Sequence, residues 1–244
     1  MGPAPLLLLF DIDGTLLLGA NAAHRGAIGE ALRVVHGVTE PDHGAKQVAG
    51  RTDRDIARGL LLAAGVSARR IDERADDVQI AACEAYARLC PKDLSATVAP
   101  GMRELLGRLG AREDVILSLV TGNYEPIAHM KLAAAGIGAY FARGQGGFGS
   151  DHEDRSMLPA IARRRAGGAG GAPWPRERTL LIGDTPRDIA CAHADGVRVI
   201  AIATGPFAAA ALTGADAVAR DALELGGLLD ELVARPDPSA AGHG

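Results

Sequence analysis

Four short apolar runs recur along this sequence, and none of them alternates with polar residues. They are Leu6–Phe10, Val115–Val120, Thr179–Ile182 and Val197–Ala203, with a weaker fifth run at Asp216–Ala219. A strand that is covered on both faces needs apolar side chains at successive positions, which is the pattern of a buried parallel sheet. The runs therefore predict the sheet of an α/β protein.

Helical stretches with clear start and stop signals lie between these runs. One spans Met102–Ala111, a second has Pro126 near its start and ends at Gly136, and a third opens at Pro186 and ends at Gly196. Proline in the first turn and glycine just past the last turn are typical of helices. Strands that alternate with such helices predict right-handed crossovers and a doubly wound, Rossmann-like parallel sheet.

The interval after the first run is far too long for a single crossover. About eighty residues separate Thr15 from Val98, and their apolar residues recur at three- and four-residue spacing without a strand pattern. We expect an inserted all-α domain above the carboxyl edge of the sheet, with helices at Ala23–His36, Asp53–Ala64 and Ala68–Leu89. The expected domains are a core of residues 1–17 and 97–235, an insert of residues 18–96 and a flexible tail of residues 236–244.

The charge of the chain argues against a nucleic-acid partner. The chain has 26 basic and 30 acidic residues, a formal charge of −4, and no basic stripe that could neutralise a phosphate backbone. The densest basic run, Arg163–Arg165, is interpreted as a solvated helix end. The apolar start at Leu6–Phe10 is too short to span a bilayer and lacks the flanks of a signal peptide. Three scattered cysteines predict neither a disulfide framework nor a zinc site, so a cytoplasmic protein is expected.

Two pairs of aspartates stand at predicted strand ends. Asp11 directly follows the first run and Asp13 lies two residues on, while Asp184 and Asp188 follow the run that ends at Ile182. Ligands bind beyond the carboxyl ends of the strands in an open parallel sheet. Carboxylates this close repel one another unless a cation lies between them, and Mg²⁺ suits a site with few carboxylates and a phosphate. The alternative is an ordinary Asp-x-Asp-Gly turn, while a calcium loop fails because no terminal Glu follows.

A possible anion site follows the second run. Thr121, Gly122 and Asn123 end the predicted strand, where a hydroxyl and backbone N–H groups can bind an anion. The same residues are also an ordinary helix cap, and both interpretations stay open. Arg155 opens the helix before the strand that ends at Ile182 and offers a cation, with a solvated surface arginine as the alternative.

The order of these groups resembles that of the haloacid-dehalogenase superfamily of phosphatases. Asp11–Leu16 resembles the first motif of that superfamily, Thr121–Asn123 the second and Gly183–Asp188 the fourth. The long insert resembles the helical cap of its phosphoglycolate-phosphatase-like branch, and the resemblance covers nearly the whole chain. It implies a Mg²⁺-dependent phosphoric monoester hydrolase that acts on a small phosphorylated metabolite through an aspartyl-phosphate intermediate.

The resemblance implies a role for each matching residue. Asp11 would be the nucleophile that attacks phosphorus, and Asp13 would protonate the leaving oxygen and then activate water. Mg²⁺ would be held by the Asp11 carboxylate, the Asp13 backbone carbonyl and Asp184, with Asp188 in support. The phosphoryl oxygens would be bound by Thr121, Gly122 and Asn123.

The third motif is where this sequence departs from the family, which normally has a lysine there. The corresponding segment is 151–156, and Arg155 is the expected cation because a guanidinium can bind a phosphate or a carboxylate. Lys131, ten residues after Thr121, is the rival for this role.

The insert is expected to determine specificity. Its loop at residues 50–53 resembles the substrate-facing loop of related caps, so Arg51 is a substrate-binding candidate. The alternative is that Thr52 or Asp53 only caps a helix and that Arg51 is solvated. No role is assigned to the histidines His24, His129, His152 and His193.

Three other functions compete with hydrolysis. A phosphomutase uses the same acid pair and differs mainly in how well its cap excludes water. A haloacid dehalogenase lacks the second acid of the first motif, so Asp13 counts against that chemistry. A non-catalytic binding protein is disfavoured because every acid of the first and fourth motifs is present. The substrate and the oligomeric state are left open by the sequence.

Overall fold

The computed structural model describes residues 5–39 and 48–234. No helix in these ranges is long and apolar enough to cross a membrane. In chain order the elements are β1 (Leu6–Phe10), α1 (Ala22–His36), α3 (Asp53–Ala63), α4 (Ala68–Glu73), α5 (Ala75–Leu89), α6 (Met102–Gly110), β2 (Val115–Thr121), α7 (Glu125–Ala134), β3 (Gly147–Phe148), α8 (Leu158–Ala166), β4 (Thr179–Gly183), α9 (Pro186–Asp195), β5 (Arg198–Ile202), β6 (Ala217–Ala219) and α10 (Ala222–Ala234).

The strands form one parallel sheet in the order β3-β2-β1-β4-β5-β6. The chain builds outward from β1 to β2 and β3, and then returns to the other side of β1 to add β4, β5 and β6. This is the strand order of a doubly wound fold, and the predicted fold class is confirmed. The strand β3 was not predicted, because two residues are too few to carry a hydrophobic pattern.

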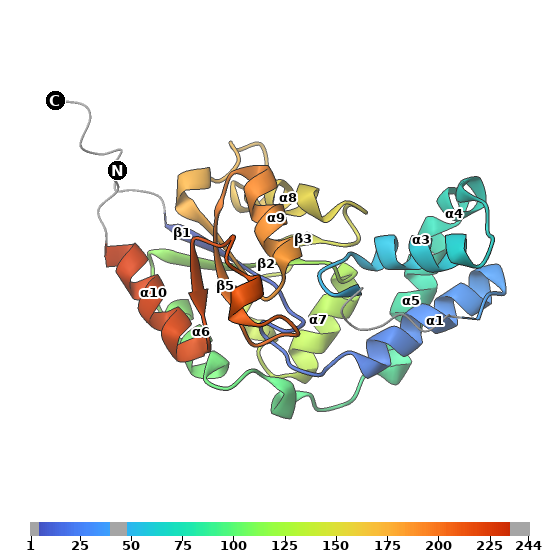
Figure 1. The fold of residues 1–244 in the computed structure, drawn as a ribbon, viewed down its shortest axis with the longest axis horizontal. Helices are drawn as coiled ribbons and strands as arrows, with labels where there is room; N and C mark the ends of the chain where they lie inside the picture. Colours follow the sequence, from blue (N-terminus) through green and yellow to red (C-terminus); the bar gives the residue numbers. More distant parts are fainter. Residues whose placement is uncertain (1–4, 40–47, 235–244) are drawn as a thin grey trace.

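Helices cover both faces of the sheet, which explains why the strand sequences do not alternate. All five residues of β1 are buried. Leu6, Leu8 and Phe10 pack in one apolar cluster with α6 and α10, whereas Leu7 and Leu9 pack in another with α8 and α9. Figure 1 shows these two pairs of helices on opposite sides of the strands.

The insert is a helical body of its own, at one end of the molecule (Figure 1). Its helices α1, α3, α4 and α5 share an apolar cluster, which Tyr124 and Ile127 join from the start of α7. The predicted all-α insert is confirmed. The helix predicted at Ala68–Leu89 is in fact two helices, α4 and α5, because the backbone of Arg74 leaves the helical region with φ −120° and ψ 12°. The exact domain boundaries stay a prediction, and the tail at residues 236–244 lies outside the described residues.

The basic run Arg163–Arg165 does end a helix, α8, but the interpretation of Arg163 as solvated was wrong. The Arg163 side chain is buried and donates from Nε and Nη2 to the two carboxylate oxygens of Asp195, at 2.7 and 2.9 Å. It also donates from Nη1 to the backbone oxygen of Trp174, at 2.6 Å. The arginine therefore ties α8 to the end of α9.

Candidate active site

The predicted acids meet at the point where the strand order reverses. Asp11 follows β1 and Asp184 follows β4, and these two strands are neighbours in the sheet. One carboxylate oxygen from each of Asp11, Asp184 and Asp188 lies within 4.8 Å of the other two, and all three residues are buried. Ligands of doubly wound folds bind in the crevice at this reversal of strand order.

Three glycines make room for these carboxylates. A Cβ atom at Gly14, where φ is +96°, would lie 2.2 Å from Asp184 Oδ2, and a Cβ at Gly205 would lie 1.7 Å from the same oxygen. A Cβ at Gly183 would lie 2.3 Å from the Cγ of Asp188. Gly205 follows β5, and nothing in the sequence around it points to this contact.

Asp188 is held in place by the start of α9. Its carboxylate accepts hydrogen bonds from the N–H and the hydroxyl of Thr185, at 3.0 and 2.7 Å, and its own N–H donates to the Thr185 hydroxyl. This reciprocal capping arrangement satisfies N–H groups that a helix start would leave free. The remaining oxygen of Asp188 is then available to Arg155.

The carboxylate cluster holds more acidic groups than positive charges. Burial raises the pKa of Asp11 to about 7, and the charges of Asp188 and Asp13 add to the rise while Arg155 opposes it. Burial and the charges of Asp11 and Asp188 raise the pKa of Asp184 to about 9. Asp184 Oδ2 has no hydrogen-bond partner among the described residues. When all three carboxylates are ionised they exceed the one guanidinium by two negative charges, so this all-oxygen donor set fits a hard divalent cation that would replace the protons.

Arg155 lies directly beside Asp11. It begins a short 3₁₀ turn, Arg155–Met157, and its side chain is 8% exposed. Its Nη2 donates to Asp11 Oδ1 at 2.8 Å and to Asp188 Oδ1, while its Nε has no partner in the described part of the chain. The predicted cation therefore bridges an acid of the first motif and an acid of the fourth.

Lys131 is also in the site, on the other acid of the first motif. Its Nζ donates to both carboxylate oxygens of Asp13, at 2.8 and 2.7 Å, and Asn123 Nδ2 donates to Asp13 Oδ2 at 2.9 Å. Burial acts to raise the pKa of Asp13, but the charge of Lys131 and the hydrogen bonds from Lys131 and Asn123 outweigh it and lower the pKa below its ordinary value. The two rival cations therefore pair with different acids of the first motif, Arg155 with Asp11 and Lys131 with Asp13.

The loop after β2 is covered by the insert. Thr121 is buried, and its hydroxyl accepts from the N–H of Asn123 at 3.3 Å. A Cβ on Gly122 would lie 2.0 Å from the backbone oxygen of Arg51, so only glycine lets the two loops meet. The N–H of Asp53 donates to the Gly122 oxygen at 2.8 Å. The candidate phosphate-binding loop and the insert loop therefore lie in direct contact.

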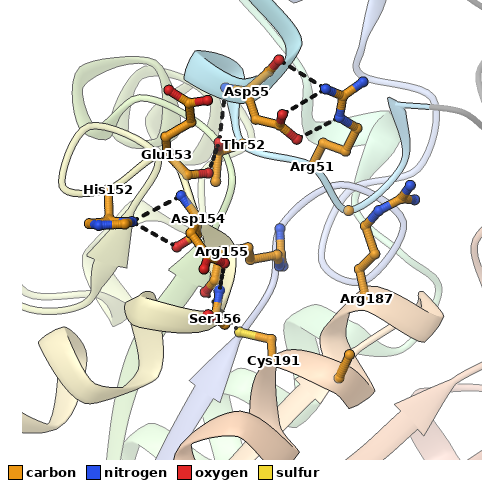
Figure 2. A pocket seen from close by; sticks show the side chains of 12 residues that line it. Arg51, Thr52, Asp55, His152, Glu153, Asp154, Arg155, Ser156, Arg187 and Cys191 are labelled. Carbon is orange, nitrogen blue, oxygen red and sulfur yellow. Dashed lines mark hydrogen bonds and ion pairs between the residues drawn. The ribbon is translucent and has the colours of Figure 1, made fainter. Parts of the chain in front are cut away.

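A cavity of about 500 Å³ opens between the insert loop and the core. Figure 2 shows Arg51 and Arg187 on one side of it and His152 and Glu153 on the other, with Arg155 between them. Arg51 lines the cavity and pairs through Nε and Nη2 with the carboxylate of Asp55, with 26% of its side chain exposed. Arg187 donates from Nη1 to the backbone oxygen of Ala49 at 2.8 Å.

Thr52 and Asp53 do more than cap a helix. The Thr52 hydroxyl accepts from the N–H of Asp55 and so caps α3, as the alternative interpretation of this loop expected, and it also donates to the backbone oxygen of Glu153 at 2.6 Å. The Asp53 carboxylate instead accepts from Nε2 of His24, at 2.9 Å. His24, to which the sequence assigned no role, contacts Lys131 through its other ring nitrogen at 3.0 Å. These partners are 29 and 107 residues apart in sequence, and no local pattern could have paired them.

Residues 8–193 match the family model of the haloacid dehalogenase-like hydrolases. The chain belongs to this family. A phosphoglycolate phosphatase from Rhodospirillum rubrum is 30% identical over 207 residues, which cover 82% of this chain and 80% of that protein. The predicted class of enzyme, a phosphoric monoester hydrolase, is thereby confirmed.

Two solved structures have a similar fold. A Bacteroides vulgatus protein, provisionally assigned as a beta-phosphoglucomutase, superposes with a TM-score of 0.66 at 20% identity and covers 98% of this chain and 91% of its own. CbbY from Rhodobacter sphaeroides, in complex with xylulose-(1,5)bisphosphate, superposes with a TM-score of 0.62 at 19% identity, over 91% of this chain and 96% of its own. At these identities the likeness establishes the fold.

Proposed function

We propose that this hydrolase removes phosphate from a small phosphomonoester, with Mg²⁺ as cofactor and Asp11 as the nucleophile. The observation that supports this most directly is the cluster of Asp11, Asp184 and Asp188 around the guanidinium of Arg155, at the switch point of the sheet. The cluster offers an attacking carboxylate, oxygen ligands for a cation and a fixed positive charge within one buried volume.

In the first half of the reaction, a carboxylate oxygen of Asp11 attacks phosphorus and the bond from phosphorus to the leaving oxygen breaks. Asp13 donates its proton to that leaving oxygen, so an alcohol departs and an aspartyl phosphate remains. Arg155 stays beside Asp11 and reduces the repulsion between the carboxylate and the anionic phosphate. Because Lys131 and Asn123 favour the ionised form of Asp13, this step requires Asp13 to take up a proton when the phosphate ester binds, before the leaving oxygen departs.

In the second half, a water oxygen bonds to phosphorus and the bond from phosphorus to Asp11 breaks. Asp13, now a carboxylate, accepts the proton of that water, and inorganic phosphate leaves. Both aspartates return to their starting protonation states. The contacts of Asp13 with Lys131 and Asn123 stabilise the carboxylate that this half requires.

Mg²⁺, held by Asp11, Asp184 and the backbone carbonyl of Asp13 with Asp188 in support, would supply positive charge against the phosphoryl oxygens. Thr121, Gly122 and Asn123 would orient the remaining phosphoryl oxygens. The unpartnered Oδ2 of Asp184 and the charge excess of the cluster support this assignment.

The substrate we propose carries a second anionic group on its leaving alcohol. Arg51 and Arg187 line the cavity of about 500 Å³ that borders Arg155, and Arg51 would exchange its contact with Asp55 for the substrate anion. The relatives point the same way, since one is named for phosphoglycolate and another was solved with a bisphosphate. Phosphomutase activity is the second candidate, because the Bacteroides vulgatus neighbour is assigned to that class.

The test is release of phosphate from phosphoglycolate and from p-nitrophenyl phosphate, with Mg²⁺ and with EDTA. We expect turnover only with Mg²⁺, and loss of turnover on both substrates in Asp11→Asn. Asp93→Asn, at an exposed position, is the matched control and should keep full activity. Equal activity of Asp11→Asn and wild type would refute the proposal, and an isomerised sugar phosphate without free phosphate would favour the mutase.

A further inference from the structure

Lys131 is a fully buried ammonium whose hydrogen bonds are all accounted for. It is 0% exposed, and its Nζ lies 2.8 and 2.7 Å from the two oxygens of Asp13 and 3.0 Å from Nδ1 of His24. An ammonium has three donors and no acceptor, so these three contacts use its full capacity. Its position is therefore determined by His24 as well as by Asp13.

The contact with Lys131 determines the tautomer of His24. Because Lys131 can only donate, Nδ1 must accept with its lone pair, and the ring proton must lie on Nε2. That N–H donates to Asp53 Oδ2 at 2.9 Å. A neutral imidazole thus links the carboxylate of Asp53 to the ammonium of Lys131, as a carboxylate orients a histidine in many catalytic and metal sites.

Asp53 is anchored on both sides of the boundary between insert and core. Its side chain is 4% exposed. Oδ2 also accepts from the N–H of Tyr124 at 2.7 Å, and the N–H of Asp53 itself donates to the oxygen of Gly122 at 2.8 Å. His24 on α1 and Asp53 on α3 belong to the insert, whereas Lys131 on α7 and Asp13 belong to the core.

We propose that His24 and Asp53 are positioning residues for the acid–base group Asp13, acting through Lys131. This inference rests on the proposed function, in which Asp13 transfers the proton of the leaving group. The insert then contributes half of a continuous chain, Asp53–His24–Lys131–Asp13, and completes the acid–base unit when it packs on the core. Lys131 has a flexible four-carbon stem, so without His24 only Asp13 itself would restrain the ammonium.

The chemistry of the first half-reaction gives a readout specific to this role. A strongly basic leaving group needs the proton from Asp13 as its bond to phosphorus breaks, whereas a weakly basic one departs without it. Phenyl phosphate and 2,4-dinitrophenyl phosphate differ in this property while sharing an aryl ring. The value of kcat/KM reports the steps up to formation of the aspartyl phosphate, so it isolates the half-reaction in which the proton is donated.

The variant to test is His24→Phe, which keeps a ring in the site and removes both nitrogens. We expect kcat/KM for phenyl phosphate to fall about 10²-fold, the lower end of general acid contributions, and kcat/KM for the dinitrophenyl ester to fall less than about threefold. Asp53→Ala should give the same pattern. Asp53→Asn should recover most of the loss, because its amide oxygen can still accept from His24 and Tyr124.

The matched control is His129→Phe, another buried histidine, which packs on Phe148 and has no hydrogen-bond partner for Nε2 among the described residues. It should leave the ratio of the two kcat/KM values unchanged. Equal losses of both substrates in His24→Phe would mean a purely structural role and would overturn the inference, as would no loss at all. If Asp11→Asn stayed active, the proposed function itself would fail, so the two failures are distinguishable.

Discussion

Replacing Gly205 by alanine should disable the site through a single methyl group. The backbone φ at Gly205 lies outside the left-handed region, so the main chain itself tolerates alanine. The added Cβ, however, would lie 1.7 Å from Asp184 Oδ2, against the 3.4 Å at which ordinary contact begins. The carboxylate or the loop must therefore move by about 1.7 Å, the difference between these two distances.

The size of this displacement sets the expected loss. A misplacement of about 1 Å at a catalytic group can cost about 10²-fold in rate, so we expect the Mg²⁺-dependent kcat/KM to fall by at least about 10²-fold. We also expect the Mg²⁺ concentration for half-maximal activity to rise, by about 10- to 100-fold. Both are measured by titrating Mg²⁺ against turnover of p-nitrophenyl phosphate.

Gly227→Ala is the matched control, because it makes the same substitution in α10, where a Cβ meets nothing within 4 Å. It should leave activity unchanged and raise stability by about 0.5–1 kcal/mol, since glycine is a poor residue for a helix interior. Wild-type activity and Mg²⁺ dependence in Gly205→Ala would refute the placement of Asp184 in the metal site.

Three further outcomes are expected. Without metal, the pKa values of Asp11 and Asp184 are higher in the folded state than in the unfolded state. Between about pH 4 and about pH 9 the folded state therefore binds more protons, and the free energy of unfolding should fall as pH rises. Mg²⁺ should therefore raise the melting temperature more at about pH 8 than at about pH 5; equal increments would contradict this. Arg163→Leu should lower the free energy of unfolding by about 3 kcal/mol in denaturant titrations, because the buried Asp195 carboxylate would keep, among the described residues, only its longer contact with the exposed Arg176, at 3.4 Å. Arg155→Lys should keep kcat/KM within about tenfold of the wild-type value, since a single nitrogen of Arg155 contacts both Asp11 and Asp188. Arg155→Met, which removes the charge, should lower kcat/KM by at least about 10²-fold. Similar kcat/KM values for the two variants would contradict the charge-based role of Arg155.

The sequence was sufficient for the architecture because the architecture depends on local patterns. A strand that is buried on both faces needs apolar residues at successive positions, and the runs at Leu6–Phe10 and Thr179–Ile182 show this pattern in the sequence itself. The helix starts at Pro126 and Pro186 are equally local. By contrast, β3 has only two residues, which form a strand because they pair with β2. Two residues are too few for a hydrophobic pattern, so the sequence could not predict this strand.

For the site, the sequence alone identified Asp11, Asp184 and the neighbouring motif residues as the candidates, because strand ends in a parallel sheet share one edge. Only the tertiary structure decided how the charges divide, with Arg155 beside Asp11 and Lys131 beside Asp13. It also brought in His24, Asp53 and Gly205, which approach the site from the insert and from the loop after β5. Their roles depend on contacts between residues far apart in the chain, and a hydrogen bond or a close approach of that kind leaves no periodic signal in the sequence that makes it.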